Sequence, residues 1–288
     1  MQLIYYTEID HVQKQVDYLL ARLKSFQESN EPANLHLAFR CAAMDIITSY
    51  CFAKSHNTLE TPGFKNHIIM GIQNSWSMSW LIRYVPWLVS VLRAIPVWLL
   101  LRMNPQLKGI TDLRSQVENQ IDETLRDPAS LQSADHEIIY HYWLQLDSGK
   151  RQLRPSKNDL LHEAINFKFA GTDTVGNICT VGTFHVLNNK AVREILVKEL
   201  DAVWPDRNAT LAYEVLEKLP YLVRSPWIFL KIVKFDDIQT AVIKESLRIG
   251  VGAVTPLPRV VGPGDAEIAG INVQAGVGKL LIGMKRPG

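Results

Sequence analysis

The chain is poor in cysteine and has no cysteine cluster. Its 288 residues include only three, Cys41, Cys51 and Cys179, which are odd in number and far apart. No C-x-x-C pair or Cys/His cluster with zinc-binding spacing occurs, so neither a disulfide framework nor a structural metal site is expected. A reducing, intracellular compartment is the simplest interpretation.

The sequence also lacks long runs of like charge, internal repeats and a phosphate-binding loop. Its 31 Lys and Arg residues nearly balance 29 Asp and Glu residues, for a net charge of +2. Nucleic acid is therefore not an expected partner. The glycine-containing stretch "GPGDAEIAG", residues 262–270, lacks the strand, loop and helix order that a phosphate loop requires.

No segment has the pattern of a secretory signal or of a membrane-spanning helix. The opening "MQLIYYTEIDHVQK" has neither a basic region nor a long apolar run after it. The most apolar region, residues 76–105, is interrupted at Arg83, Pro86, Arg93, Pro96 and Arg102. Its longest uncharged piece, residues 84–92, is much shorter than the ~20 residues needed to span a bilayer. Helices packed in a core and helices lying on a membrane surface both remain open for this region.

Helical periodicity dominates the rest of the chain. It predicts helices at residues 8–26, 34–53, 107–126, 157–187, 191–204 and 240–249. Only after Pro256 does the pattern alternate, at 258–261 and 266–273, which predicts short strands with Gly270 at a turn. The predicted fold class is mainly α with a small β element.

The stretch "FKFAGTDTV", residues 167–175, lies within the longest predicted helix. Because Gly171 costs about 1 kcal/mol relative to alanine inside a helix, some group is expected to approach the backbone closely there. Asp173 and Thr174 place an acid beside a hydroxyl and can loosen the helix locally. A flat ligand beside a proton-handling pair is one interpretation. A glycine used for helix packing, beside a solvated Asp and Thr, is the other.

Two further motifs follow along the chain. Glu245 and Arg248 in "KESLR" are three residues apart on one helix face and can form a bidentate ion pair. In "TPLPRVV", residues 255–261, the prolines keep the backbone extended, and Arg259 leads into a predicted strand. A fixed cation after a stiff apolar loop suits an acidic ligand group, although a proline-rich turn with a surface arginine explains it equally well.

In this order, the three motifs resemble those of the cytochrome P-450 family of haem-thiolate monooxygenases, and most closely the fungal members of secondary metabolism. The resemblance extends from about Glu8 to Gly276 and implies an α-rich but incomplete fold, with residues 1–288 forming a single partial domain. One departure lies in the first motif, where Val175 occupies a position that often carries a second hydroxyl residue.

The resemblance also assigns roles to residues. It implies that Ala170 and Gly171 lie over the distal face of the haem, and that Asp173 and Thr174 deliver protons for dioxygen cleavage. It implies a buried structural pair of Glu245 and Arg248 and a contact between Arg259 and a haem propionate. The implied substrate pocket is lined by Phe167, Val254, Thr255, Pro256 and Leu257.

The implied chemistry is insertion of one oxygen atom from O2 into a C–H bond of an apolar small molecule. Haem would be the cofactor, and an NADPH-dependent reductase would supply electrons. Residues 76–103 would then form a lid that dips into the membrane and admits lipophilic substrates. The full-length relative would sit on the cytoplasmic face of the endoplasmic reticulum membrane, whereas this chain shows no anchor or signal.

The family's axial iron ligand is a cysteine in an F-x-x-G-x-R-x-C-x-G loop that follows the P-x-P-R strand. No cysteine follows Arg259 in this chain, so no metal ligand is assigned and the chain is expected to be inactive as written. Two alternatives of other classes remain: a non-catalytic helical remnant and an unrelated helical interaction module.

Two segments do not match the family. Removing residues 223–239 leaves "LPYLTAVIKESLR", a continuous family-like approach to the Glu245 motif. Valine codons begin with GT and the glutamine codon CAG ends in AG, so this insert of 17 residues, or 51 nucleotides, has the form of a retained intron. Residues 277–288 also resemble nothing in the family and are expected to be a non-native tail. A genuine loop insertion with a natural truncation is the alternative.

Overall fold

The structure is a computed structural model. It describes residues 2–85, 87–144, 155–206, 209, 211–223, 242–250, 258–260, 262, 264–268, 271–275 and 278–280. The chain divides into two compact units, Met1–Gly250 and Val251–Gly288, and each is described by itself.

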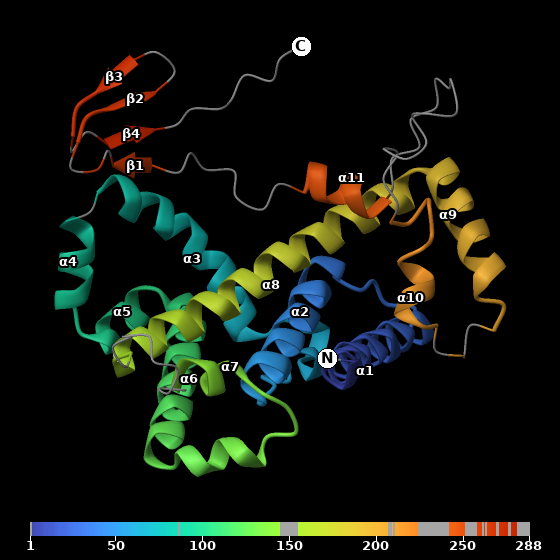
Figure 1. The fold of residues 1–288 in the computed structure, drawn as a ribbon, viewed down its shortest axis with the longest axis horizontal. Helices are drawn as coiled ribbons and strands as arrows, with labels where there is room; N and C mark the ends of the chain where they lie inside the picture. The colour runs from blue at the N-terminus through green and yellow to red at the C-terminus, as the bar shows by residue number, and fades with distance from the viewer. Residues whose placement is uncertain are drawn as a thin grey trace. The chain divides into compact units, whose positions relative to one another are not determined.

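The first unit is helical (Figure 1). Its α-helices are α1 (Gln2–Glu28), α2 (Leu35–Phe52), α3 (His67–Tyr84), α4 (Trp87–Ala94), α5 (Val97–Met103), α6 (Lys108–Arg126), α7 (Ile139–Leu144), α8 (Lys157–Asn188), α9 (Lys190–Val203), α10 (Tyr213–Leu216) and α11 (Val242–Ile249). Short 3-10 helices are η1 (Thr58–Glu60), η2 (Pro62–Phe64), η3 (Pro105–Leu107) and η4 (Pro128–Ser133). All six predicted helices are present.

The second unit holds short antiparallel strands. β1 (Pro258–Val260) pairs with β4 (Gly278–Leu280), and β2 (Ala266–Ile268) pairs with β3 (Ile271–Val273). The predicted fold class, mainly α with a small β element, is therefore confirmed. The segment expected to be a tail, residues 277–288, contains β4, in which Lys279 lies opposite Arg259.

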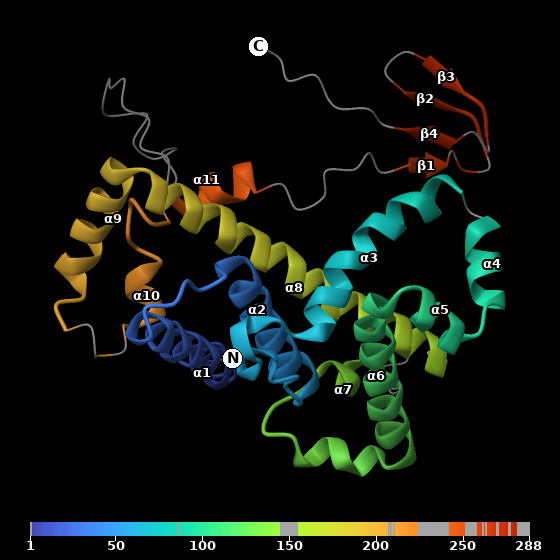
Figure 2. The same ribbon diagram turned by 180° about the vertical axis from the view of Figure 1, so that it is seen from behind.

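Helix α8 is the longest element of the first unit and runs past α2, α6 and α11, as the opposite views of Figures 1 and 2 show. It begins at a capping box, in which the Ser156 hydroxyl accepts a hydrogen bond from the Asp159 backbone N–H at 3.2 Å. The Asp159 carboxylate accepts one in return from the Ser156 N–H at 2.8 Å. These bonds satisfy backbone donors that a helix start leaves unpaired, which explains why α8 begins at Lys157.

Two glycines of α8 lie where another helix comes very close. A Cβ atom added to Gly176 would lie 2.5 Å from the Arg40 Cγ and 3.0 Å from the Arg40 Cα of α2. One added to Gly182 would lie 2.5 Å from the Ser246 hydroxyl of α11. Since no real side chain fits at such distances, the packing of α8 against α2 and α11 requires glycine at both positions.

The core of the first unit lies where α1, α2, α3, α6, α7 and α8 meet. Its buried apolar side chains are Leu19, Leu37, Ala38, Cys41, Ala42, Met44, Phe52, Leu59, Phe64, Ile68, Ile69, Ile72, Leu113, Val117, Ile121, Ile138, Tyr140, Leu160, Leu161 and Ala164. Of residues 76–105, none whose burial the structure describes belongs to this set, and α5 has no buried residue. Trp87 and Trp98 are 68% and 67% exposed. Among the described residues, no helix combines the length and apolarity needed to cross a membrane.

One buried cation, Lys168 of α8, lies inside this core. It is only 1% exposed, its Nζ atom donates to the His56 Nε2 at 3.0 Å, and the same atom lies 4.6 Å from the centre of the Phe52 ring. Burial lowers the pKa of Lys168 to about 8, and the charge of Lys54 acts in the same direction. Burial also lowers the pKa of His56 to about 4, with Lys168 adding to the effect. His56 is therefore neutral near pH 7 and can accept from Lys168, whereas Lys168 loses its proton at a lower pH than an exposed lysine does.

We predict that Lys168 makes the stability of the protein rise with pH under alkaline conditions. Between pH 8 and 10.5 the unfolded chain binds a proton at this lysine that the folded chain does not. The free energy of unfolding should rise across this window by about 3 kcal/mol from this group alone. Urea denaturation followed by circular dichroism should show the rise in the parent and its loss in Lys168→Met.

Lys157→Met is the matched control, because Lys157 lies on the surface of the same helix and pairs with Asp122. It should keep the pH dependence of the parent chain. If the free energy of unfolding of Lys168→Met rises between pH 8 and 10.5 as much as that of the parent, the burial of an ionisable amine at this position is contradicted.

Candidate functional site

The predicted motif at residues 167–175 lies in the middle of α8 and has two different sides. Phe167, Ala170 and Thr174 are exposed and follow helical spacing along one side, here called the outer face of α8. The Thr174 hydroxyl donates a hydrogen bond to the Ala170 carbonyl oxygen at 2.6 Å. The outer face therefore combines a small side chain, an aromatic ring and a hydroxyl.

Gly171 lies beside a neighbouring helix rather than on the outer face. A Cβ atom at this position would lie 2.8 Å from the Cγ1 and 3.1 Å from the Cδ1 of Ile47 in α2. The expected close approach to the backbone is therefore made here by a side chain of the same chain. Of the two small residues assigned to the haem face, Ala170 is exposed and Gly171 packs against α2.

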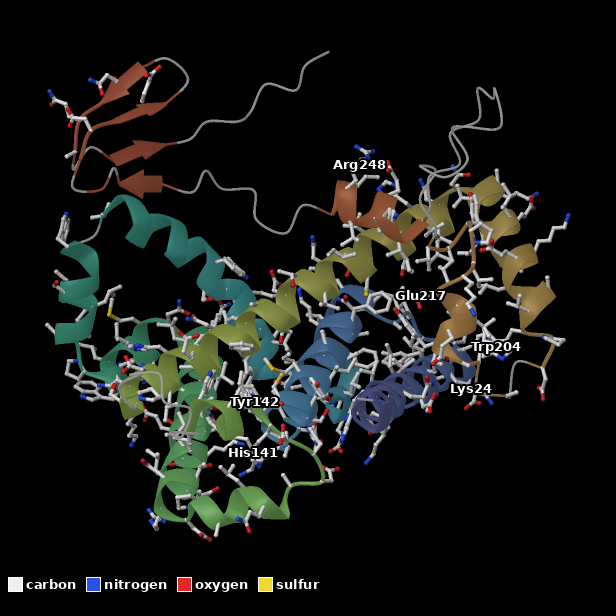
Figure 3. All side chains as sticks on the ribbon, in the orientation of Figure 1. Lys24, His141, Tyr142, Trp204, Glu217 and Arg248 are labelled. Atoms are coloured by element: carbon white, nitrogen blue, oxygen red, sulfur yellow. The ribbon has the colours of Figure 1, made fainter. Side chains whose placement is uncertain are left out.

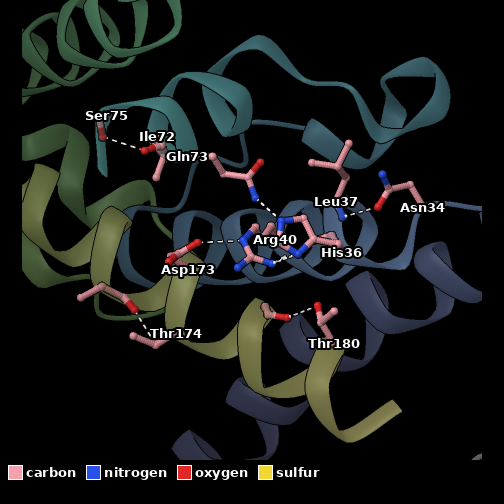
Figure 4. Close-up of polar contacts among 12 residues, drawn as sticks. Asn34, His36, Leu37, Arg40, Ile72, Gln73, Ser75, Asp173, Thr174 and Thr180 are labelled. Carbon is pink, nitrogen blue, oxygen red and sulfur yellow. Dashed lines mark hydrogen bonds and ion pairs between the residues drawn. The ribbon is translucent and has the colours of Figure 1, made fainter. Parts of the chain in front are cut away.

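Asp173 forms a hydrogen-bonded ion pair with Arg40 of α2, as Figure 4 shows. The Arg40 Nε atom donates to the Asp173 Oδ1 at 2.7 Å, and the two side chains are 5% and 20% exposed. An ion pair this close, with little exposure, orients both groups. Asp173 is thus held by a cation and is not the solvated acid of the packing interpretation.

Arg40 also contacts His36 of its own helix, and His36 in turn contacts Gln73 of α3. The Arg40 Nη1 atom donates to the His36 Nδ1 at 3.0 Å and to the His36 carbonyl oxygen at 3.1 Å, and the other ring nitrogen of His36 faces the Gln73 side-chain amide (Figure 4). Burial lowers the pKa of His36, Arg40 lowers it further, and Asp173 opposes the shift. A neutral His36 accepts from Arg40 and so supports the orientation of the guanidinium group.

The sequence analysis missed Arg40 and His36. Both lie in α2, a helix that is mostly apolar and largely buried, and Arg40 is 4% exposed. A buried arginine needs a carboxylate partner, so its presence in such a helix could have indicated one. The sequence gives no indication of which acid it is, since Asp173 lies 133 positions away.

Glu245 and Arg248 form the expected pair within α11, but it is not buried. The Arg248 Nε atom donates to both carboxylate oxygens of Glu245 at 2.8 Å. The side chains of Glu245 and Arg248 are 28% and 55% exposed, and Figure 3 places Arg248 on the outer side of α11. This corrects the expectation of a buried pair. The hydrogen bond lowers the pKa of Glu245 and raises that of Arg248.

The remaining predicted site residues belong to the second unit. The backbone of Arg259 lies in β1, but its side chain is outside the described residues. Val254, Thr255, Pro256 and Leu257 lie outside them altogether. Their predicted roles at a haem propionate and in a substrate pocket stay predictions.

All three cysteines have thiols with a raised pKa. Burial raises the pKa of Cys41 to about 12, and it also raises the pKa of Cys51 and Cys179. A metal-ligating or reactive cysteine instead has a lowered pKa in an electropositive setting. None of the three cysteines shows such a lowered pKa.

Comparison with known proteins identifies the family of this arrangement. The model of the cytochrome P-450 family matches residues 6–225. A cytochrome P-450 monooxygenase of Ascocoryne sarcoides is 27% identical over 91% of this chain and 49% of its own length. One of Penicillium terrestre is 28% identical over 88% of this chain and 46% of its own length. A tryptophan 6-hydroxylase of Fusarium equiseti is 27% identical over 83% and 43%.

The fold of a solved structure agrees with this match. A cytochrome P-450 crystal structure superimposes with a TM-score of 0.65 at 16% sequence identity, over 96% of this chain and 54% of that one. The chain spans about half the length of the curated relatives it matches. The family match covers well over half of the 288 residues, and the chain therefore belongs to the cytochrome P-450 family, alongside fungal monooxygenases.

Proposed function

We propose that this chain is the dioxygen-side part of a haem monooxygenase of fungal secondary metabolism, with the haem lying against the outer face of α8. The observation that carries the proposal is the arrangement around residue 173. An exposed Ala170 and an exposed Thr174 lie beside an acid that Arg40 holds in place. The fungal monooxygenases among the relatives support the reaction class. Haem would supply the activation of dioxygen.

The residues of the chain would position and protect this reaction. Ala170 leaves room for a planar ring on the outer face, and Phe167, which is 40% exposed, would line the apolar substrate pocket. The Thr174 hydroxyl donates its hydrogen bond to the Ala170 carbonyl oxygen. Its own oxygen can still accept a hydrogen bond on the exposed side. Asp173, held by Arg40, would be the acid that supplies protons to this path.

The same proposal includes the partners implied by the family. An NADPH-dependent reductase would supply electrons, and the substrate would be a lipophilic small molecule. The exposed Trp87, Trp98 and Met103 of α4 and α5 support a membrane-surface contact for this region, since tryptophan prefers the interface between lipid and water. The endoplasmic reticulum membrane, on its cytoplasmic face, is the proposed location of the full-length relative.

We also propose that the 288 residues as written are inactive in oxygen insertion. The three cysteines all have thiols with a raised pKa, and groups such as Asp173 and Thr174 cannot act on an iron that nothing holds. The specific alternative is a non-catalytic helical remnant that binds haem weakly or uses exposed apolar helices to contact a partner. The large exposed side chains of Phe184 and Leu187, at 60% and 55%, favour this alternative.

A haem titration of the purified chain tests the assigned face. We expect weak haem uptake without the thiolate-type spectrum of the reduced carbon monoxide complex. Ala170→Trp fills the space for the ring and should weaken haem binding by more than roughly tenfold, about 1.4 kcal/mol. Because Ala170 is exposed, the helical circular dichroism should be kept.

His162→Trp is the matched control, since His162 is an exposed residue of α8 away from the outer face. It should leave haem affinity unchanged. Equal affinities for the two tryptophan variants would contradict the assigned face, and a thiolate-type spectrum would contradict the proposed inactivity. Stable helical folding with no haem uptake would favour an interaction module.

We also propose that residues 223–239 are a retained intron and that residues 277–288 are a non-native tail. The family match ends at residue 225, just inside the first of these segments, which supports the first part. We expect transcripts from which the 51 nucleotides encoding 223–239 are absent. Transcripts that encode residues 223–239 and terminate after Gly288 would contradict both the retained intron and the non-native tail. Sequencing complementary DNA across both junctions makes the measurement.

A further inference from the structure

A cluster of two histidines and one aspartate lies far along the chain from the proposed haem face. His11 belongs to α1, and Asp135 and His136 follow η4. One potential ligand atom from each residue lies within 4.8 Å of the other two. The His11 Nε2 is 3.5 Å from the Asp135 Oδ2, and the His136 Nδ1 is 2.7 Å from the Asp135 Oδ1.

The hydrogen bonds of His136 show that a cation belongs in this cluster. Its Nε2 atom faces the Tyr50 carbonyl oxygen, which can only accept, so that nitrogen carries a hydrogen. The Nδ1 atom of a neutral ring then presents a lone pair to a carboxylate oxygen at 2.7 Å. Two acceptors at this distance repel unless a proton or a metal ion lies between them.

His11 brings a second imidazole to the cluster. A proton on the His136 Nδ1 satisfies one contact with Asp135, and a neutral His11 can donate its own Nε2–H toward the other carboxylate oxygen. A metal ion can instead engage all three residues at once, because one potential ligand atom from each lies within 4.8 Å of the other two. The rings of His11 and His136 lie with centroids 4.5 Å apart, which keeps both nitrogens near the same point.

The His136 ring is also held as a metal ligand usually is. Its second nitrogen donates to a backbone carbonyl, and the ring stacks on Tyr50 with an interplanar angle of 5°. Such outer contacts fix the tautomer and orientation of ligating histidines. The His136 side chain is 9% exposed, so this part of the cluster is preorganised.

We infer that His11, Asp135 and His136 form a binding site for a divalent transition metal of the zinc class. Two imidazole nitrogens and one carboxylate oxygen suit Zn²⁺, whereas Mg²⁺ and Ca²⁺ prefer all-oxygen sites. Tetrahedral ligands at ~2.0–2.1 Å from zinc lie roughly 3.3 Å apart. The His11 Nε2 and the His136 Nδ1 contact different oxygens of Asp135, at 3.5 and 2.7 Å, so binding one shared ion requires a movement of the Asp135 side chain, which is 67% exposed.

A metal ion here would fasten α1 to the segment that follows η4 and, through the Tyr50 carbonyl, to the end of α2. Three protein ligands would leave a fourth position for water. Binding to the folded chain alone would raise its stability by mass action.

Zinc titration of the 288-residue chain, by calorimetry in competition with a chelator, tests the site. We expect one bound Zn²⁺, an increase in Tm on zinc addition, and no increase with Mg²⁺. His11→Ala and Asp135→Asn should each weaken zinc binding by at least roughly tenfold. Both substitutions leave the buried contacts of His136 in place, so the folded chain remains available for the measurement.

His67→Ala is the matched control. The His67 Nε2 lies 3.0 Å from the Asp112 Oδ2, which is a histidine and aspartate pair outside the three-ligand cluster. This variant should bind zinc as the parent does, and Co²⁺ should give tetrahedral absorption bands in both. The proposal is overturned if the parent shows no zinc binding, if His11→Ala and Asp135→Asn bind as tightly as the parent, or if His67→Ala loses as much affinity.

Discussion

The first unit depends on how closely the backbones of α2 and α8 approach each other. At Gly176 of α8 the space of a Cβ atom is taken by Arg40 itself, and at Gly171 by Ile47. This approach brings the Arg40 guanidinium to Asp173 and removes both groups from most of the solvent. A larger residue at either glycine would separate the helices and weaken that ion pair. The glycines and the acid of the motif therefore work together.

Much of this fold could be predicted from local sequence patterns. The long helix was predicted at 157–187 and observed as α8 at Lys157–Asn188, because its cap and its period are both local features. Short strands at 258–261 and 266–273 were also predicted, since alternation is local, and β1, β2 and β3 lie there. Strand β4 was not predicted, because it lies in the segment expected to be a tail. The choice between core packing and a surface position for residues 76–105 was left open. The absence of any buried residue in α5 goes against core packing for that helix.

The sequence could not predict side-chain contacts between segments that lie far apart in the chain. Asp173 and Arg40 are 133 positions apart, and Lys168 and His56 are 112 apart. His11 lies far along the chain from Asp135, so a search for short metal-binding spacings misses the cluster and predicts no metal site. A pair three residues apart, Glu245 and Arg248, was predicted correctly as a pair. Its exposure was not predicted, because exposure depends on what packs against α11.

Cys41 has a consequence for how movements of α2 can be measured. Its side chain is 0% exposed, and its thiol donates a hydrogen bond to the Phe64 carbonyl oxygen at 3.5 Å. Because the thiol is fully buried, it meets an alkylating reagent only when the segments around it open. The modification rate of this sulfur thus reports how often that part of the molecule opens while the rest stays folded.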